Sequence, residues 1–499
     1  MKKYLLFFLL IPILNFGQQQ IGQNIDHINQ PDATGTSVAI SEDGNIIAVG
    51  SPSHSANGID KAGAVRVFRN LAGNWVQIGQ VIEGTSINDQ FGHHLSLSAD
   101  GKVVAIATHN LPGNSGYVQV YRNVLGNWTK VGTDILGAAG VAFFNNHHIS
   151  LSADGSIIAV GDGNATTPNG AHSGVVRLYE NISGVWTQLG QDINGKTTWN
   201  KSGEKVSLSA NGRIVAFTSR SQNSNSGNEY VSVYYRNTAG NWVQLGNDFY
   251  TQGSWIQGGT THISISLSAN GGVLAIGNCY APNNSQITSS MGMVQIYQYE
   301  HLTNTWTQIG QDITDPYAYG QFGACISLSS DGDVVAISDH NSEANGVANA
   351  GFVQVYRKIS GTWTQIGSTI GKNTNEMYKY GIALSGNGNT LAVGLRLRPA
   401  TVFDPLISFV RVYDMTKPMS SDSFVMKSFN IYPNPATDVL HISLENNLIL
   451  GKVIIYNNLG QIVKETSEES FDTSTLASGI YYVEIHTNEG KATKKVVVK

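Results

Sequence analysis

Two pairs of adjacent histidines are the residues of this chain whose type best suits metal binding. They are His93-His94 and His147-His148, and each pair precedes a stretch in which apolar and polar residues alternate. Neighbouring side chains of a β-strand point to opposite faces, so each pair can offer only one imidazole to a common ion. We therefore predict no metal site, and we interpret His94 and His148 as polar residues at the entrance of a channel.

Catalytic motifs are absent from the sequence. It contains no Gly-x-Ser-x-Gly elbow, no His-Glu-x-x-His helix and no phosphate-cradling glycine loop. Four aspartates recur at one repeat position, which indicates local turn bonding: Asp134, Asp192, Asp248 and Asp312. We assign no catalytic residue and no cofactor. A hydrolase with two paired acids stays open, because sequence alone cannot pair the acids of the loops.

Aromatic residues outside any repeat are the candidates for ligand binding. Flat rings bury a large area at low entropic cost and stack on sugars or on other side chains. The alternative is that they only hold long loops together. The candidates are Trp199, Trp255, Tyr280, Tyr317 and Tyr319.

The composition excludes several partners. Only 13% of the residues are charged and the net charge is −5, so a basic surface for nucleic acid is not expected. The 55 glycines favour a turn-rich β protein over a coiled coil.

These candidate residues must be positioned by an internal repeat. A Ser-x-Asp/Asn-Gly turn recurs about every 57 residues, somewhat longer than a kelch blade. A Trp followed by a Gln-Ile-Gly-like run is the second marker of each unit. The turns end at Gly44, Gly101, Gly155, Gly212, Gly271, Gly332 and Gly388, and the tryptophans are Trp75, Trp128, Trp186, Trp242, Trp306 and Trp363.

Each repeat predicts four antiparallel strands, which form one blade of a propeller. The last unit ends near Tyr413 without a Trp strand. The segment Gln20-Ile21-Gly22-Gln23 matches Gln77-Ile78-Gly79-Gln80, so we expect the first strand to close the last blade. The chain is thus predicted to be all-β, with a seven-bladed propeller of four-stranded blades over residues 18–415.

Strand parity places the tight turns on one rim and the long loops on the other, where we expect function. The positions aligned with His94 should surround the channel on the long-loop rim: Ser37, His148, Lys205, Ser264, Cys325 and Gly381. Of the residues around the channel, we add His94, His148 and Lys205 to the candidates for ligand binding. Cys279 and Cys325 also lie on this rim, so a disulfide between neighbouring blades is feasible.

The N-terminus predicts export. Lys2 and Lys3 precede an apolar run over residues 4–14, which is too short to span a bilayer but suits a secretory signal peptide over residues 1–17. No later apolar stretch is long enough to cross a membrane, so we expect no membrane span in the mature chain.

The repeats resemble the integrin-like FG-GAP family of seven-bladed propellers. The matching residues include Gly35-Thr36-Ser37-Val38-Ala39, Phe91-Gly92 and Phe322-Gly323. The calcium-binding loop of that family carries several aspartates, whereas Ser41-Glu42-Asp43-Gly44 offers at most one in alternation. Calcium is therefore not implied.

The C-terminal segment predicts a second domain. Residues 416–427 form a polar linker, and residues 428–499 alternate short strands and turns, as in a small β-sandwich. This segment resembles the C-terminal sorting domain of the type IX secretion system of Bacteroidetes. The resemblance rests on blocks that contain Pro433, Asn434, Pro435, Gly479, Tyr481, Lys495 and Lys499.

The resemblance implies Sec export to the periplasm and transfer across the outer membrane by the type IX machinery, followed by release or attachment to the surface. We therefore predict a secreted or cell-surface binding or adhesion propeller whose ligand is a glycan or a surface protein. The alternatives are a polysaccharide hydrolase or lyase with its site on the long-loop rim, and a structural spacer without a ligand.

Overall fold

The fold was determined from a computed structural model of the chain. It describes residues 18–29, 31–110, 116–136, 145–146, 148–220, 229–251, 263–283, 286–290, 292–314, 320–341, 350–371, 376–378, 381–397, 407–416, 429–444, 449–457, 461–487 and 490–499. These residues form two compact units, one spanning Gln18–Thr416 and the other lying within Lys417–Lys499. The predicted signal peptide and most of the predicted linker lie outside the described residues.

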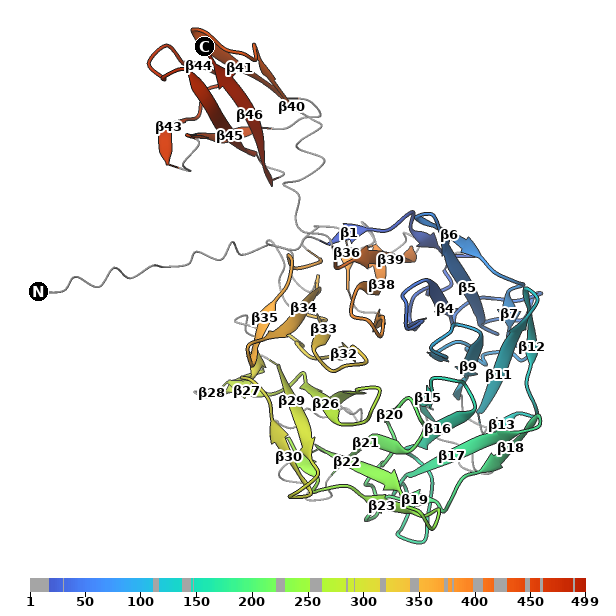
Figure 1. Cartoon of the computed structure of the whole chain (residues 1–499). Helices are drawn as coiled ribbons and strands as arrows, with labels where there is room; N and C mark the ends of the chain where they lie inside the picture. Colours follow the sequence, from blue (N-terminus) through green and yellow to red (C-terminus); the bar gives the residue numbers. More distant parts are fainter. Residues whose placement is uncertain are drawn as a thin grey trace, which may run out of the picture. The chain divides into compact units, whose positions relative to one another are not determined.

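The first unit is a ring of antiparallel sheets, which we call blades 1 to 7 (Figure 1). Blade 1 comprises β3 (Val38–Ile40), β4 (Ile46–Ser51), β5 (Ala64–Leu71), β6 (Asn74–Gln77) and β7 (Ile82–Glu83). Blade 2 comprises β8 (His94–Leu97), β9 (Val103–Ala107), β11 (Tyr117–Val124), β12 (Asn127–Lys130) and β13 (Ile135–Leu136). Blade 3 comprises β15 (Ile149–Leu151), β16 (Ile157–Asp162), β17 (Val175–Ile182), β18 (Val185–Gln188) and β19 (Ile193–Asn194).

The remaining blades follow the same order from the inner strand outward. Blade 4 comprises β20 (Val206–Leu208), β21 (Ile214–Arg220), β22 (Glu229–Arg236), β23 (Trp242–Gln244) and β24 (Phe249–Tyr250). Blade 5 comprises β25 (Ile263–Leu267), β26 (Val273–Asn278), β29 (Met293–Glu300), β30 (Thr305–Gln308) and β31 (Ile313–Thr314). Blade 6 comprises β32 (Cys325–Leu328), β33 (Val334–Asp339), β34 (Phe352–Ile359) and β35 (Thr362–Gln365).

Blade 7 combines the two ends of this unit. It comprises β37 (Ile382–Leu384), β38 (Thr390–Leu397), β39 (Ser408–Asp414), β1 (Gln19–Gln20), β2 (Ile25–Asp26) and β36 (Glu376–Met377). Two short ribbons lie outside the blades: β10 (His109–Asn110) with β14 (Asn145–Asn146), and β27 (Pro282–Asn283) with β28 (Gln286–Ser290).

The recurrent Ser-x-Asp/Asn-Gly sequence builds the turn after each inner strand. In blade 2, Ser98 Oγ donates a hydrogen bond to Asp100 Oδ1 (2.7 Å) and accepts one from Val103 N (2.9 Å). Gly101 has a φ of 68°, and a Cβ there would lie 2.6 Å from Ile46 Cδ1 of blade 1. Glycine is therefore required both by the backbone angle and by the close packing of the neighbouring blade.

The outer strand of a typical blade is divided by a bulge at a second glycine. In blade 1, β6 and β7 pair with the same strand β5 on either side of Gly79, whose φ is 76°. The bulge turns the Ile78 carbonyl toward blade 2, where it accepts a hydrogen bond from Trp128 Nε1 (2.8 Å). The same bond recurs from Trp75, Trp186, Trp242, Trp306 and Trp363, each to the preceding outer strand. The repeat tryptophans thus join neighbouring blades.

The ring is closed by main-chain hydrogen bonds. The tight turns donate to one another in sequence, from Glu42 N to Ala99 O and on around the ring to Ser330 N and Gly386 O. Asn387 N then donates to Glu42 O (3.2 Å), which returns to the starting turn. At the outer edge, β1 pairs with β39 through Gln19 and Asp414, as expected for an N-terminal strand that completes the last blade.

The second unit consists of two antiparallel sheets. One contains β40 (Phe429–Tyr432), β41 (Val439–Leu444) and β44 (Ser470–Asp472), and the other contains β43 (Ile462–Thr466), β42 (Leu450–Tyr456), β45 (Gly479–Thr487) and β46 (Gly490–Val498). Residues of both sheets share one core, which includes Phe429, Leu440, Val453 and Ile485. The predicted all-β architecture, a propeller followed by a small β-domain, is confirmed. The sequence did not reveal strands β40 and β44.

Candidate functional site

The inner-strand positions predicted to surround the channel all lie at the start of an inner strand. Two of them are occupied in building the ring, because Ser37 Oγ donates to Gly92 O (2.6 Å) and Ser264 Oγ donates to Gly323 O (2.7 Å). These serines bind the neighbouring blade and are buried. The positions that carry chemistry are therefore on blades 2, 3, 4 and 6.

The histidines of blades 2 and 3 lie together. The ring centroids of His94 and His148 are 3.9 Å apart, and those of His93 and His94 are 4.7 Å apart. His93 precedes β8, so the alternation of a strand does not separate it from His94 as we expected. His147 lies outside the described residues. Among the residues that the structure describes, no group of three or more His, Cys, Asp or Glu could hold a metal ion.

Cys325 of blade 6 lies beside the imidazole of His340. Its Sγ is 3.8 Å from His340 Nε2, and its main-chain nitrogen donates to Ser338 Oγ (3.0 Å). Burial raises the pKa of the Cys325 thiol, but the His340 contact and the charge of Lys205 outweigh this and lower the pKa to about 7. Burial lowers the pKa of Lys205. Of the two thiols, Cys325 has the lower pKa.

The two cysteines are not joined in the structure. Cys279 and Cys325 are both thiols, so the disulfide that we considered feasible is not formed here. Cys279 is buried, and burial raises the pKa of its thiol to about 12. The two thiols therefore differ strongly in reactivity.

Trp199 lies in the loop of residues 195–203, which connects blade 3 to blade 4 and which we call the Trp199 loop. Its main-chain nitrogen donates to Ala171 O (2.9 Å), and Lys201 N donates to His172 O (3.0 Å). In the corresponding loop after blade 1, Asn88 N donates to Asp60 O (2.8 Å). Asn88 and Trp199 both have a φ of 61°, so the two loops share one backbone path.

The Trp199 side chain stacks on an imidazole and remains accessible. Its ring centroid is 4.1 Å from that of His172, with an interplanar angle of 27°. The residue is 54% exposed. Trp199 and His172 form a flat surface on the long-loop rim, which we call the Trp199 platform.

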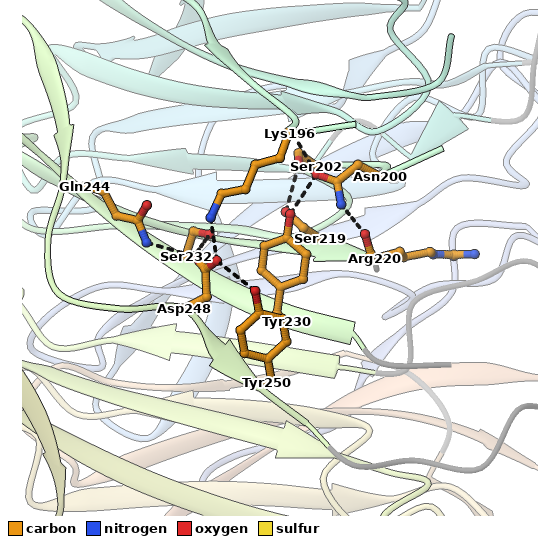
Figure 2. Close-up of polar contacts among 10 residues, drawn as sticks. All are labelled: Lys196, Asn200, Ser202, Ser219, Arg220, Tyr230, Ser232, Gln244, Asp248 and Tyr250. Carbon is orange, nitrogen blue, oxygen red and sulfur yellow. Dashed lines mark hydrogen bonds and ion pairs between the residues drawn. The ribbon is translucent and has the colours of Figure 1, made fainter. Parts of the chain in front are cut away.

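A network of polar contacts around Asn200 fixes the Trp199 loop (Figure 2). Asn200 Oδ1 accepts hydrogen bonds from Lys196 N (2.8 Å), Ser202 Oγ (3.1 Å) and Tyr230 Oη (2.7 Å). The amide of Asn200 donates to Arg220 O, and the hydroxyls of Ser202 and Ser219 are 2.7 Å apart. Asn200 is buried, and both ends of its carboxamide form hydrogen bonds. This buried side chain therefore holds the loop in place.

Asp248 anchors the other side of the same network (Figure 2). It forms an ion pair with Lys196 of the Trp199 loop and accepts hydrogen bonds from Ser232 Oγ (2.7 Å) and Gln244 Nε2 (2.8 Å). Lys196 also lies 5.4 Å from the centre of the Tyr230 ring. We predicted only local turn bonding for Asp248, yet the structure adds this bond between blade 4 and the loop that enters it.

Of the other predicted aromatic residues, the structure describes Tyr280. Tyr280 is half-buried and its hydroxyl accepts a hydrogen bond from Gln321 Nε2 (2.7 Å), so it links two loops. Trp255, Tyr317 and Tyr319 lie outside the described residues. His172 and Lys196 could not be selected from the sequence, because neither visibly interrupts the repeat and both contact residues that are distant in the chain.

The sorting-motif residues of the second unit lie against the C-terminal strand. Asn434 Nδ2 donates to Lys495 O (3.1 Å), and Asn434 Oδ1 accepts from Val497 N (2.9 Å). The peptide bonds before Pro433 and Pro435 are both cis. Gly479 begins β45, and Tyr481 is buried with its hydroxyl donating to Ala477 O (2.8 Å). Lys499 N donates to Ala436 O (2.9 Å), which fixes the end of the chain.

Comparison with known proteins supports the assignment of a separate C-terminal domain. Residues 430–499 match the family of the secretion system C-terminal sorting domain. No curated protein matches the chain. Among the described residues, no helix has the length and apolar character needed to cross a membrane.

Solved structures resemble the fold at low sequence identity. Hydrazine synthase of Kuenenia stuttgartiensis is 11% identical over 74% of this chain and 94% of its own, with a TM-score of 0.49. The periplasmic gluconolactonase PpgL of Pseudomonas aeruginosa is 15% identical over 72% and 96%, with a TM-score of 0.44. A protein from Lactobacillus plantarum is 15% identical over 75% and 97%, with a TM-score of 0.45.

The class of protein follows from the fold and the tail together. The chain is an all-β propeller that carries a type IX secretion sorting domain at 430–499. Such a tail implies export to the cell surface or the medium, by way of the type IX machinery.

Proposed function

We propose that this protein is an exported binding or adhesion propeller, and that the Trp199 platform contacts its ligand, a glycan or a surface protein. The signal peptide over residues 1–17 directs Sec export, and the propeller over residues 18–415 is the part that functions outside the cell. The linker over 416–427 joins it to the sorting domain over 428–499. After transfer, the protein is released or attached to the surface.

The observation that carries this proposal is the backbone of Trp199. A positive φ costs a bulky residue about 1 kcal/mol or more, whereas Asn adopts it readily. The equivalent loop uses Asn88 at this φ, so the fold itself favours a small polar residue here. Tryptophan gains a stacking contact with His172 but stays 54% exposed, so burial in the core does not explain it. The indole ring therefore serves contact with something outside the chain.

The platform is also preorganised. The Asn200 network and the Lys196–Asp248 ion pair hold the loop before any ligand arrives. A rigid aromatic surface loses little conformational entropy on binding. Stacking on a sugar or side-chain face is the interaction that such a surface offers.

The test uses the mature protein on a glycan array and against extracted surface proteins. We expect Trp199→Ala and Trp199→Asn to weaken binding at least about 10-fold, the usual effect of removing an aromatic anchor. Trp199→Asn should leave the melting temperature unchanged or higher, because Asn suits this φ. Leu125, which is 99% exposed in blade 2, supplies the control Leu125→Ala.

Three outcomes distinguish the functions. Saturable binding that both Trp199 variants lose supports the proposal. Shortened oligosaccharides in the assay would instead indicate the hydrolase or lyase alternative. Binding that is unchanged in both variants would remove the platform from the function.

A further inference from the structure

A second surface with binding chemistry lies on the opposite rim, where the tight turns of blades 4 and 5 meet. A groove of about 640 Å³ opens between the hairpin that joins β22 to β23 and the hairpin that joins β29 to β30. The turns after β20 and β25 form its inner end. The Trp199 platform is on the long-loop rim, so the two surfaces are separate.

The groove is cationic. Arg213 and Arg236 line it, and no Asp or Glu does. Among the residues that the structure describes, neither guanidinium forms an ion pair. Arg236 Nε donates to Gly240 O (3.2 Å), which orients the guanidinium and leaves its terminal nitrogens available. A guanidinium matches the planar geometry of a carboxylate and also binds sulfate well.

The carboxamides that line the groove add hydrogen-bond donors. Asn211 Oδ1 accepts from Ser209 Oγ (2.9 Å) and Arg213 N (3.0 Å), and Asn270 Oδ1 accepts from Ser268 Oγ (2.9 Å) and Gly272 N (2.8 Å). Asn304 Oδ1 accepts from Tyr299 Oη (2.7 Å). With these oxygens engaged inside the protein, the amide nitrogens are the groups left for a ligand. The groove therefore suits a molecule rich in acceptor oxygens.

Aromatic side chains give the groove a flat face. Tyr235 is 37% exposed, and Tyr299 packs edge-on against His301 with ring centroids 4.9 Å apart. Val243, 39% exposed, adds an apolar patch. Such a surface stacks on the apolar face of a sugar ring.

Two of these residues depart from the repeat. In blades 1 to 3 the residue opposite the repeat tryptophan is Asn70, Asn123 or Asn181, whose side chain caps the hairpin by accepting from Gly73, Gly126 or Gly184. Blades 4 and 5 have Arg236 and Tyr299 at this position, and blade 6 has Lys358. In blade 4 the hairpin is capped instead by Asn237, whose Oδ1 accepts from Asn241 N (2.9 Å). Arg236 and Tyr299 both line the groove.

We propose that this groove binds an acidic saccharide, a sugar unit that bears a carboxylate or a sulfate. The arginines bind the acidic group, the asparagine amides bind hydroxyls, and the tyrosines stack on the ring. The short groove and the net charge of −5 do not suit an extended polyanion such as nucleic acid. The site stands on its own residues and does not depend on the Trp199 platform.

Isothermal titration of the purified mature protein tests the site with three probes of equal length: an oligogalacturonate, a sulfated oligogalactan and a neutral oligogalactan. We expect at least one acidic probe to bind, and to bind at least about 10-fold more tightly than the neutral one. Arg213→Gln and Arg236→Gln should each weaken that binding about 10-fold or more, as expected for a charged hydrogen bond. Binding of the oligogalacturonate would identify the acidic group as a carboxylate, and binding of the sulfated oligogalactan would identify it as a sulfate.

The control is Arg69→Gln, which removes the same charge from an exposed arginine of blade 1. It should leave the affinity unchanged, and so should Trp199→Ala, which separates this site from the platform. Arg213 is exposed, so its variant remains informative if Arg236→Gln folds poorly. Equal loss in Arg69→Gln, full binding by Arg213→Gln, or no binding of either acidic probe would overturn the proposal.

Discussion

At the scale of single residues, the two cysteines show how position within the ring decides reactivity. Both are thiols near the long-loop rim, yet His340 and Lys205 act on Cys325 alone strongly enough to lower its pKa. For Cys279 the main influence on the pKa of the thiol is burial, which raises it. A thiolate is the reactive form, so the two residues respond differently to pH.

We predict that iodoacetamide modifies Cys325 with a rate that rises as the pH increases through about 7, the pKa of its thiol. Below this pH the thiol is protonated and the rate falls. Cys279 should remain unmodified up to pH 9, because its pKa is about 12. Mass spectrometry of tryptic peptides after timed labelling measures both rates.

His340→Gln is the matched variant. It removes the imidazole contact, so burial should then dominate and the midpoint should rise by more than about one pH unit. A midpoint that stays near 7 in this variant would assign the effect to another group.

At the scale of elements, the hydrogen bond from each repeat tryptophan to the bulge of the preceding blade explains why Trp and Gly recur together. A Cβ at Gly79 would lie 2.7 Å from Trp128 Cδ1, so the glycine makes room for the indole that its bulge binds. The bond satisfies a main-chain carbonyl that pairing within the sheet leaves open. Gly79 and Trp128 thus act together to join neighbouring blades.

Trp128→Phe should destabilise the propeller by about 1–3 kcal/mol, because the Ile78 carbonyl loses its donor and part of the buried ring is lost. Trp128 is 3% exposed, so solvent cannot replace the bond easily. The urea midpoint of unfolding measures the change. Trp199→Phe is the control, and an equal shift in that exposed variant would contradict the proposed role of the bond.

At the scale of the whole molecule, the stability of the ring depends on one short segment. Strands β1 and β2 complete blade 7, and Ile25 of β2 is buried against blades 1 and 7. Ile21 O accepts the hydrogen bond of Trp75 Nε1 (2.9 Å), so this segment joins the last blade to the first. No other blade combines the two ends of the unit.

Deleting Gln18–Asp26 should lower the free energy of unfolding by about 3–5 kcal/mol, since two isoleucines lose burial and the edge of β39 loses its partner. We also expect concentration-dependent aggregation through that edge. Calorimetry and light scattering measure the two effects. Deletion of 417–499 is the control and should leave the melting of the propeller unchanged, whereas an N-terminal deletion that melts like the full chain would show that the closure contributes little.

The repeat could be read from the sequence because each of its residues meets a local requirement. The Asp100-Gly101 turn and the alternation around Leu95 and Leu97 depend on backbone angles or strand parity, which neighbouring residues determine. Trp128 was visible because it recurs once per blade, although its hydrogen bond reaches the preceding blade. The match of Gln20-Ile21-Gly22-Gln23 to Gln77-Ile78-Gly79-Gln80 predicted how the ring closes, and β1 pairs with β39 accordingly. The sorting domain was recognisable for the same reason, since its motifs are contiguous.

The two proposed binding surfaces could be predicted only in part from the sequence, because they combine residues that are distant in the chain. Trp199 could be selected because it is an aromatic residue outside the repeat. Its stacking on His172 and the Lys196–Asp248 ion pair that holds its loop could not be predicted, because they join segments that meet only in the folded ring. The groove of Arg236 and Tyr299 lies on the rim that we did not expect to function. By itself, the sequence determined the repeated blades and the sorting domain, since both can be recognised from contiguous patterns. The tertiary structure alone decided which side chains of neighbouring blades face one another, since that depends on packing between sheets.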